Sequence, residues 1–179
     1  MHVLMATIPH SGTSLTIRAF EDAGFAQMGV GEPMDRHMDE DRLRWSHLHE
    51  PKKRERVREL AEMGMPLVCP IRHPFRNYES HKHRSASETH LERMLLAWRA
   101  CLKDIFPHAL ILPVDADAEV RHLHHVELQE ALGIELPIDW KRIVNSKPPG
   151  RVDMPLEESR APEVWQRLAG HPILKGIYG

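Results

Sequence analysis

The sequence predicts an α/β fold in which helices cover both faces of a mainly parallel sheet. Two observations carry this prediction. Short apolar runs alternate along the chain with stretches of helical periodicity, which is typical of βαβ units. The runs are apolar throughout, as strands buried on both faces are. At 179 residues the chain fits a single domain over residues 1–179 with one sizeable core.

The chain opens with a strand, a polar loop and a helix. Residues 3–8 form an apolar run that ends at Pro9, and a helical stretch follows from residue 15 to residue 23. Gly24 is placed to end this helix, because glycine readily adopts the left-handed conformation that follows a helix.

The second quarter of the chain is less regular. Residues 31–50 are charged and weakly periodic, and we interpret them as an irregular excursion. Residues 52–63 predict a helix with its apolar positions on one face. Residues 66–71 predict a short strand that ends at Pro70, since proline cannot donate to a central ladder.

The rest of the chain predicts two longer helices, one strand and a short last helix. Ser85-x-x-Glu88 fits a capping box before apolar residues at helical spacing from Leu91 to Ile105. Residues 109–114 predict a third strand, and Asp117 can cap a helix that runs to residue 132. A final helix is expected over residues 162–169.

Composition excludes several classes of protein. Lys plus Arg is 24 and Asp plus Glu is 26, a net charge of −2, so the chain is not a uniformly basic nucleic-acid binder. Cys69 and Cys101 form neither a disulfide framework nor zinc-ligand spacing, and we expect buried, reduced thiols. No apolar stretch approaches the ~20 residues that cross a bilayer. We therefore expect a cytoplasmic protein with no nucleic-acid or membrane partner and no metal.

The loop Pro9-His10-Ser11-Gly12-Thr13-Ser14 is a candidate anion site. It lies between a buried strand and a helix N-terminus, where backbone N–H groups, hydroxyls and the helix dipole favour negative charge. Gly12 lets the backbone approach a ligand closely. An ordinary capped turn is the alternative. The loop is not an NTPase P-loop, because no Lys follows Gly12 before Lys52.

A second motif follows the strand at residues 66–71. Arg72-His73-Pro74 comes directly after the strand, and Ser80 lies eight residues after Arg72. A strand-terminal Arg and a Ser two helical turns later can grip one phosphate from two sides, with the Arg acting as a fork.

In this order the two motifs resemble those of the sulfotransferase family. That family carries a P-K-S-G-T-T loop for the 5′-phosphosulfate after its first strand, and R-[DN]-P with a later Ser for the 3′-phosphate. The resemblance implies a three-layer, doubly wound, P-loop-like fold and 3′-phosphoadenosine-5′-phosphosulfate as the donor. The donor-binding positions that it implies are His10, Ser11, Gly12, Thr13, Ser14, Arg72 and Ser80, with a looser match at Lys147, Gly150 and Arg151.

The resemblance also implies a catalytic base for the acceptor. In the cytosolic branch of the family the base is a His in a [KR]-[TS]-H-[LF]-P segment. Here His47 matches the Ser-His-Leu part of that pattern, and His49 matches the family's spacing between this His and the 3′-phosphate Arg, which is Arg72 here. Glu50 is a third candidate, because carboxylates serve as the base in other branches.

Two departures from the family pattern matter for function. The loop Lys that contacts the donor's leaving group is His10 here, and the aromatic residue that stacks on adenine is Leu15. We expect an enzyme that moves a sulfuryl group to a hydroxyl or amine of a small-molecule, glycan or peptide acceptor, with His10 stabilising the leaving phosphate. The alternatives are an inactive protein that binds 3′,5′-bisphosphate nucleotides, and a divergent nucleotide kinase, which the missing Lys disfavours.

Overall fold

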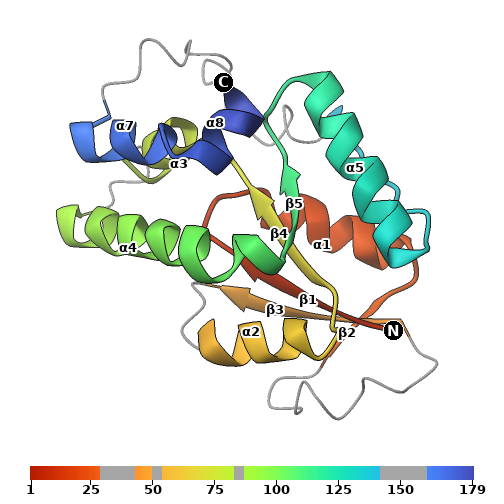
Figure 1. Cartoon of the computed structure of the whole chain (residues 1–179). Coiled ribbons are helices and arrows are strands. Elements are labelled where there is room, and N and C mark those ends of the chain that lie inside the picture. The colour runs from red at the N-terminus through yellow and green to blue at the C-terminus, as the bar shows by residue number, and fades with distance from the viewer. Residues whose placement is uncertain (29–42, 50–53, 83–86, 142–160) are drawn as a thin grey trace.

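The computed structural model of the chain describes residues 1–28, 43–49, 54–82, 87–141 and 161–179 (Figure 1). Its centre is one sheet of five parallel strands in the order β2-β3-β1-β4-β5. The strands are β1 (His2–Thr7), β2 (Ala26–Gln27), β3 (Arg44–His49), β4 (Leu67–Ile71) and β5 (Leu110–Pro113). The predicted α/β class with a parallel sheet is confirmed.

Helices lie on both faces of this sheet (Figure 1). One face carries α1 (Thr13–Asp22) and α5 (Ala118–Leu132). The other face carries α2 (Arg54–Glu62), α3 (Pro74–Lys82), α4 (Glu88–Asp104), α7 (Glu163–Ala169) and α8 (Pro172–Tyr178). A short 3₁₀ helix, η2 (Phe106–His108), leads into β5. None of the helices described is long and apolar enough to cross a membrane.

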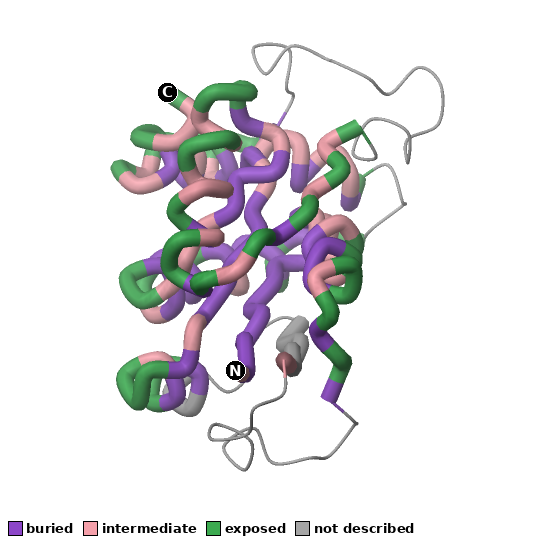
Figure 2. Tube along the Cα trace, turned by 90° about the vertical axis from the view of Figure 1, so that its right-hand side faces the viewer, coloured by how far each residue is buried: buried purple, intermediate pink, exposed green. Residues whose placement is uncertain are grey.

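The alternation of side chains along β1 explains why the sheet needs cover on both sides. Val3 and Met5 pack into the core under α1 and α5, whereas Leu4 and Ala6 pack into the core on the opposite face. All are fully buried. Figure 2 shows the burial that results for the described residues, with buried strand residues inside and exposed residues on the helices around them.

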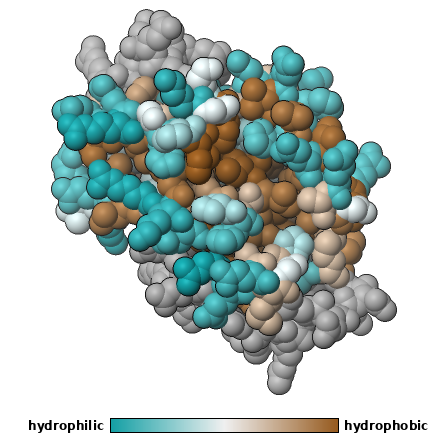
Figure 3. Space-filling view, viewed as in Figure 1, coloured by the Kyte–Doolittle hydropathy of each residue, from teal (hydrophilic) through white to brown (hydrophobic). Residues whose placement is uncertain are grey.

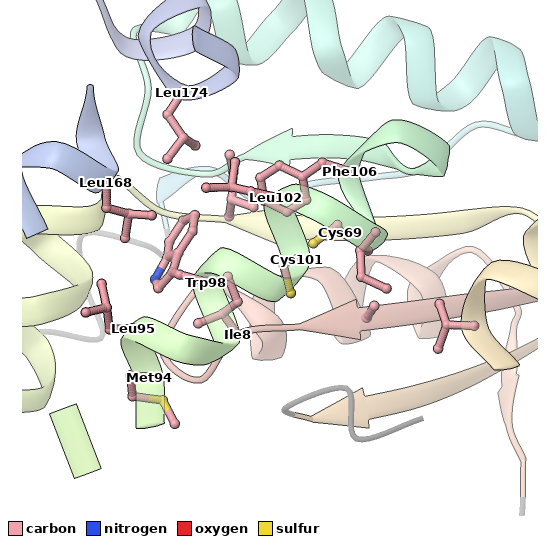
Figure 4. Close-up of a cluster of buried hydrophobic side chains, with 14 of the residues drawn as sticks. Ile8, Cys69, Met94, Leu95, Trp98, Cys101, Leu102, Phe106, Leu168 and Leu174 are labelled. Carbon is pink, nitrogen blue, oxygen red and sulfur yellow. The ribbon is translucent and has the colours of Figure 1, made fainter. Parts of the chain in front are cut away.

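The larger core surrounds Trp98 of α4, as Figure 4 shows. The helical spacing predicted for α4 is confirmed, because Leu91, Trp98 and Cys101 all face this core. Both cysteines are buried and free, as expected, and burial raises the pKa of the Cys69 thiol. On the face that Figure 3 presents, hydrophobic residues gather towards the middle, where β5 forms the edge of the sheet.

Residues 44–49 contradict the prediction of an irregular excursion, because they form strand β3. This strand pairs with β1 in register from His2↔Arg44 to Thr7↔His49. The pairing partner lies far away in sequence, so the charged, weakly periodic segment carries no local signal of it. The two-residue strand β2 was not predicted either.

Strand β4 continues through Pro70 to Ile71, so the predicted end at Pro70 was wrong. Its register with β1 covers only Leu67 and Val68. Pro70 therefore lies beyond the β1 ladder, where its missing N–H group costs no hydrogen bond to β1.

Two further differences concern helix ends. The N-cap of α4 is Ser87, whose side chain accepts a hydrogen bond of 3.2 Å from the His90 N–H, and Ser85 lies outside the described residues. Helix α8 was not predicted, since its seven residues bury only Leu174 and give too short a periodic pattern. By contrast, Gly24, Gly64 and Gly133 follow their helices with positive φ, as expected for Gly24.

Candidate functional site

The strand order reverses next to β1, because the chain visits β2 and β3 on one side of it and β4 and β5 on the other. Ligands of such sheets bind beyond the carboxyl ends of the strands at this reversal. The loop at residues 8–12 follows β1 there, and Arg72 and His73 follow β4. The structure therefore brings the two motifs predicted to bind the donor together at the carboxyl end of the sheet.

The chain leaves β1 through a tight turn. The Ser11 N–H donates to the Ile8 carbonyl at 3.2 Å, and the buried Ser11 hydroxyl donates to the same carbonyl. Pro9 occupies the second position of the turn, and His10 occupies the third with a φ of 63°. This is the pattern of a type II turn, in which the third residue needs a positive φ. Holding a histidine there costs on the order of 1 kcal/mol.

Gly12 is the N-cap of α1 and cannot carry a side chain. Its φ is 91°, and a Cβ built on it would lie 2.6 Å from Cγ1 of Val114. Val114 directly follows β5. The turn after β1 is thus packed closely against the end of another strand.

The N-terminus of α1 opens the helix at this turn. The first N–H groups of an α-helix lack intrahelical partners and attract anions. The Thr13 hydroxyl in this first turn is buried and has no hydrogen-bond partner among the described residues. Ser14 is exposed, while the Ser11 hydroxyl is already used as a donor. The Thr13 hydroxyl is therefore a buried group of this loop whose missing hydrogen-bond partner a bound anion would supply.

An uncharged bridge joins this turn to the second motif. Nδ2 of Asn77 donates to the Pro9 carbonyl at 2.7 Å, and Nε1 of Trp98 donates to Oδ1 of Asn77 at 3.0 Å. Asn77 and Trp98 are fully buried. Helix α3 therefore fixes the backbone of the turn through a side-chain amide that the core tryptophan orients.

Three histidines, His10, His81 and His90, form a series of ring contacts that begins in the same turn. The rings of His10 and His81 meet edge to face with centroids 4.5 Å apart. Nδ1 of His81 shares a hydrogen bond of 3.1 Å with Nε2 of His90, so one ring donates and the other accepts. These rings form no metal site, since no group of three or more His, Cys, Asp or Glu residues in the described part of the chain could hold a metal ion.

A charged cluster lies at the ends of β4 and β5. Oδ2 of Asp115 lies 3.4 Å from Nε of Arg72 and 3.8 Å from Nε of Arg76. Oδ1 of Asp115 accepts hydrogen bonds from the His73 N–H at 2.9 Å and from the Tyr178 hydroxyl at 3.0 Å. Two guanidinium groups share one carboxylate, so the cluster keeps a net positive charge.

Burial sets the protonation of the two aromatic members of this cluster. It raises the pKa of Tyr178 well above its usual value, and the neighbouring Asp115 carboxylate adds to the rise. It lowers the pKa of His73, although Asp115 opposes that shift. Nδ1 of His73 accepts a hydrogen bond of 3.1 Å from the Phe75 N–H at the start of α3, which requires an unprotonated Nδ1.

Not all the predicted site residues can be placed. His10, Ser11, Gly12, Thr13 and Ser14 form the turn and the start of α1, and Arg72 lies beside it. Ser80 lies half-buried in α3, one helical turn after Arg76, and among the described residues it forms no hydrogen bond to Arg72. Four other predicted residues lie outside the described residues, namely Glu50, Lys147, Gly150 and Arg151.

The two candidate bases lie on β3, where the structure places their backbone. His49 pairs in register with Thr7, the last residue of β1, and His47 pairs with Met5. His49 is thus at the carboxyl end of the sheet, and His47 is two residues further from it.

Sequence reasoning did not assign a role to five residues that build this site: Arg76, Asn77, His90, Asp115 and Tyr178. Two of them had a usable signal. Asn77 lies four residues from His73 and from His81, and Arg76 lies four residues from Arg72, so each belongs to one face of a helix after the second motif. Asp115 and Tyr178 reach the site from distant parts of the chain.

Comparisons of the chain with protein families, with curated proteins and with solved structures find no match.

Proposed function

We propose that the protein is a sulfotransferase that uses 3′-phosphoadenosine-5′-phosphosulfate as its donor and has the doubly wound, P-loop-like fold of that family. The resemblance of the two motifs is the basis of the proposal. The hydrogen bond of 2.7 Å between Asn77 and the Pro9 carbonyl gives it its main structural support. It joins the candidate 5′-phosphosulfate loop to the helix that follows the candidate 3′-phosphate residue, so one nucleotide can span both.

The start of α1 suits the 5′ end of the donor. Its unpaired N–H groups and the buried Thr13 hydroxyl can donate to the phosphosulfate oxygens. His10 takes the place of the family's Lys and, when protonated, can stabilise the charge that develops on the leaving phosphate. Arg72 and Ser80 would take the 3′-phosphate.

The reaction that follows from this arrangement is an in-line displacement at sulfur. The acceptor oxygen or nitrogen attacks the sulfur, and the bond from sulfur to the 5′-phosphate oxygen breaks. The acceptor proton passes to the base, and adenosine 3′,5′-bisphosphate leaves. Of the two candidate histidines the strand register favours His49, because it lies at the end of the sheet where the donor loop begins.

One observation favours a second candidate, a protein that binds 3′,5′-bisphosphate nucleotides without transferring sulfate. The His10 ring packs against the ring of buried His81, whereas a lysine would reach freely towards the donor. In that case the donor site binds nucleotide but lacks the cation that drives departure of the phosphate.

Calorimetric titration with adenosine 3′,5′-bisphosphate and with adenosine 5′-monophosphate tests the donor site. We expect the bisphosphate to bind more tightly and to raise the melting temperature. Arg72→Ala should weaken bisphosphate binding by about 2 kcal/mol and leave the monophosphate almost unchanged. Arg58→Ala, which removes the same charge from an exposed ion pair with Glu62 on α2, is the control.

Turnover of the donor with a panel of hydroxyl and amine acceptors then separates the two candidates. Release of adenosine 3′,5′-bisphosphate that depends on the acceptor supports the transferase. Tight binding without turnover across the panel favours the non-enzymatic protein. Failure to bind the bisphosphate at all would remove both candidates.

A further inference from the structure

Asp115 is the most heavily engaged side chain at the carboxyl end of the sheet. Its side chain is 3% exposed, and it contacts residues from the end of β4, from α3 and from α8. A buried carboxylate costs free energy unless several donors surround it. Here one backbone N–H and one hydroxyl donate hydrogen bonds to Oδ1, and two arginines lie at ion-pair distance from Oδ2. Oδ2 itself accepts no hydrogen bond from the described residues.

The two oxygens of Asp115 divide these partners. Oδ1 accepts the His73 N–H and the Tyr178 hydroxyl, and Oδ2 faces the two guanidinium groups. The two hydrogen bonds at Oδ1 therefore set the direction of Oδ2. The carboxylate is thus fixed in place, and it orients both arginines through ion pairs.

Each arginine keeps donors for another group. A guanidinium carries five N–H donors, and the contact to Asp115 is made at Nε in both residues. The side chains of Arg72 and Arg76 are 15% and 30% exposed, so both reach the surface. Two long, flexible side chains that would otherwise lose considerable rotamer entropy on binding are already ordered.

We propose that Asp115 and Tyr178 are positioning residues that present Arg72 and Arg76 together to a phosphate monoester of the ligand. This inference rests on the proposed function, in which that group is the 3′-phosphate of the donor. It adds Arg76 as a second phosphate-binding residue and makes α8 part of the site through Tyr178. The cluster thus selects a 3′-phosphorylated nucleotide over one that lacks this phosphate.

The opposite role for Asp115 is that of a competing anion. A carboxylate beside two arginines also repels an incoming phosphate, and its removal would then tighten binding. The two roles predict opposite signs for the same variant, which makes the inference testable.

The test is the ratio of dissociation constants for adenosine 5′-monophosphate and adenosine 3′,5′-bisphosphate, measured by calorimetry. Asp115→Asn should lower this ratio about tenfold, although it adds one positive charge to the site. Asp117→Asn, an exposed carboxylate at the start of α5 without a side-chain capping bond, makes the same charge change and should leave the ratio unaltered.

Tyr178→Phe is the second variant, because it removes one hydrogen bond and changes no charge. It should lower the ratio by about threefold, and it keeps the test decisive if Asp115→Asn does not fold. Arg76→Ala should lower the ratio as well.

An unchanged ratio in Tyr178→Phe, or tighter bisphosphate binding in Asp115→Asn, would overturn the inference while the wild-type preference for the bisphosphate still supports the proposed function. If the wild-type protein binds neither nucleotide, the proposed function is wrong and this inference falls with it.

Discussion

The two segments that meet at the carboxyl end of the sheet are held by different forces. The turn after β1 is fixed by uncharged groups, namely the amide of Asn77, the indole of Trp98 and the close packing of Gly12 on Val114. The segments after β4 and β5 are fixed by charges around Asp115. The first arrangement fixes a backbone, and the second orients side chains and leaves positive charge at the surface.

This difference suits the two ends of a nucleotide. A loop that offers backbone N–H groups must keep its shape whatever the ionisation of the ligand, and neutral hydrogen bonds achieve that. A pair of arginines needs a counter-charge to order it before the ligand arrives. Removing single groups should therefore have consequences that differ in size and in pH dependence between the two segments.

The largest effect is expected at Asp115. Asp115→Ala leaves two arginines without their counter-charge and two buried donors without an acceptor. The free energy of unfolding should fall by about 4 kcal/mol, measured by urea denaturation. Asp117→Ala, an exposed carboxylate nearby, should change it by no more than about 0.5 kcal/mol. Similar losses in both variants would show that the cluster does not hold the structure together.

The next largest effect is expected at Asn77, which fixes the turn after β1 through uncharged hydrogen bonds. Asn77→Ala leaves the Pro9 carbonyl and the Trp98 N–H without their partners. The expected loss is about 3 kcal/mol of unfolding free energy.

Because Asn77 itself does not ionise, the loss should be the same at pH 6 and pH 8. Glu79→Ala, on the same helix and half-buried, is the matched control and should cost far less. If the loss of unfolding free energy in Asn77→Ala varied steeply with pH, the turn after β1 would not be fixed by uncharged groups alone.

Most of the elements that build the sheet were predictable, because the pattern that specifies each one lies within its own segment of the sequence. The apolar runs at β1, β4 and β5 and the spacing of α4 appear directly in the sequence. Strand β3 does not appear there, since its polar residues become a strand only by pairing with β1.

The contacts that complete the site were not predictable for the same reason. Tyr178 meets Asp115 across 63 residues, and Asn77 meets Pro9 across 68. Tyr178 and Asp115 are unremarkable within their own segments, and the helical spacing that marks Asn77 gives no sign of its contact with Pro9. The loop and Arg72 were found because their chemistry lies within a few consecutive residues, whereas the groups that orient them come from elsewhere in the chain.

A third prediction concerns the close packing of the turn after β1. Gly12 and Gly24 have nearly equal φ values, 91° and 88°, but only Gly12 has atoms in the way of a Cβ. Gly24→Ala should cost about 1 kcal/mol for backbone strain alone. Gly12→Ala should cost about 2.5 kcal/mol, because overlap with Val114 adds to the strain.

The double variant Gly12→Ala, Val114→Ala separates the two contributions in Gly12→Ala. Measured against Val114→Ala alone, the glycine substitution should now cost about 1 kcal/mol, as at Gly24. If it still costs as much as in the wild-type background, overlap with Val114 is not the cause.

The smallest effect is expected at His73, where the charged cluster meets the start of α3. Burial lowers the pKa of His73, so the folded protein holds it neutral where the unfolded chain, with a pKa of about 6.5, takes up a proton. The unfolded state then binds more protons, and the contribution of His73 to stability falls as the pH drops below about 6.5.

His73→Asn keeps an acceptor for the Phe75 N–H, since asparagine is a good capping residue, and it cannot titrate. The variant should match the wild type within about 0.5 kcal/mol at pH 8 and gain stability relative to it at pH 5.5. His73→Ala loses the capping bond at every pH and should cost about 1 kcal/mol at pH 8. Urea denaturation at the two pH values measures all three proteins, and a constant difference between wild type and His73→Asn would show that His73 does not titrate with folding.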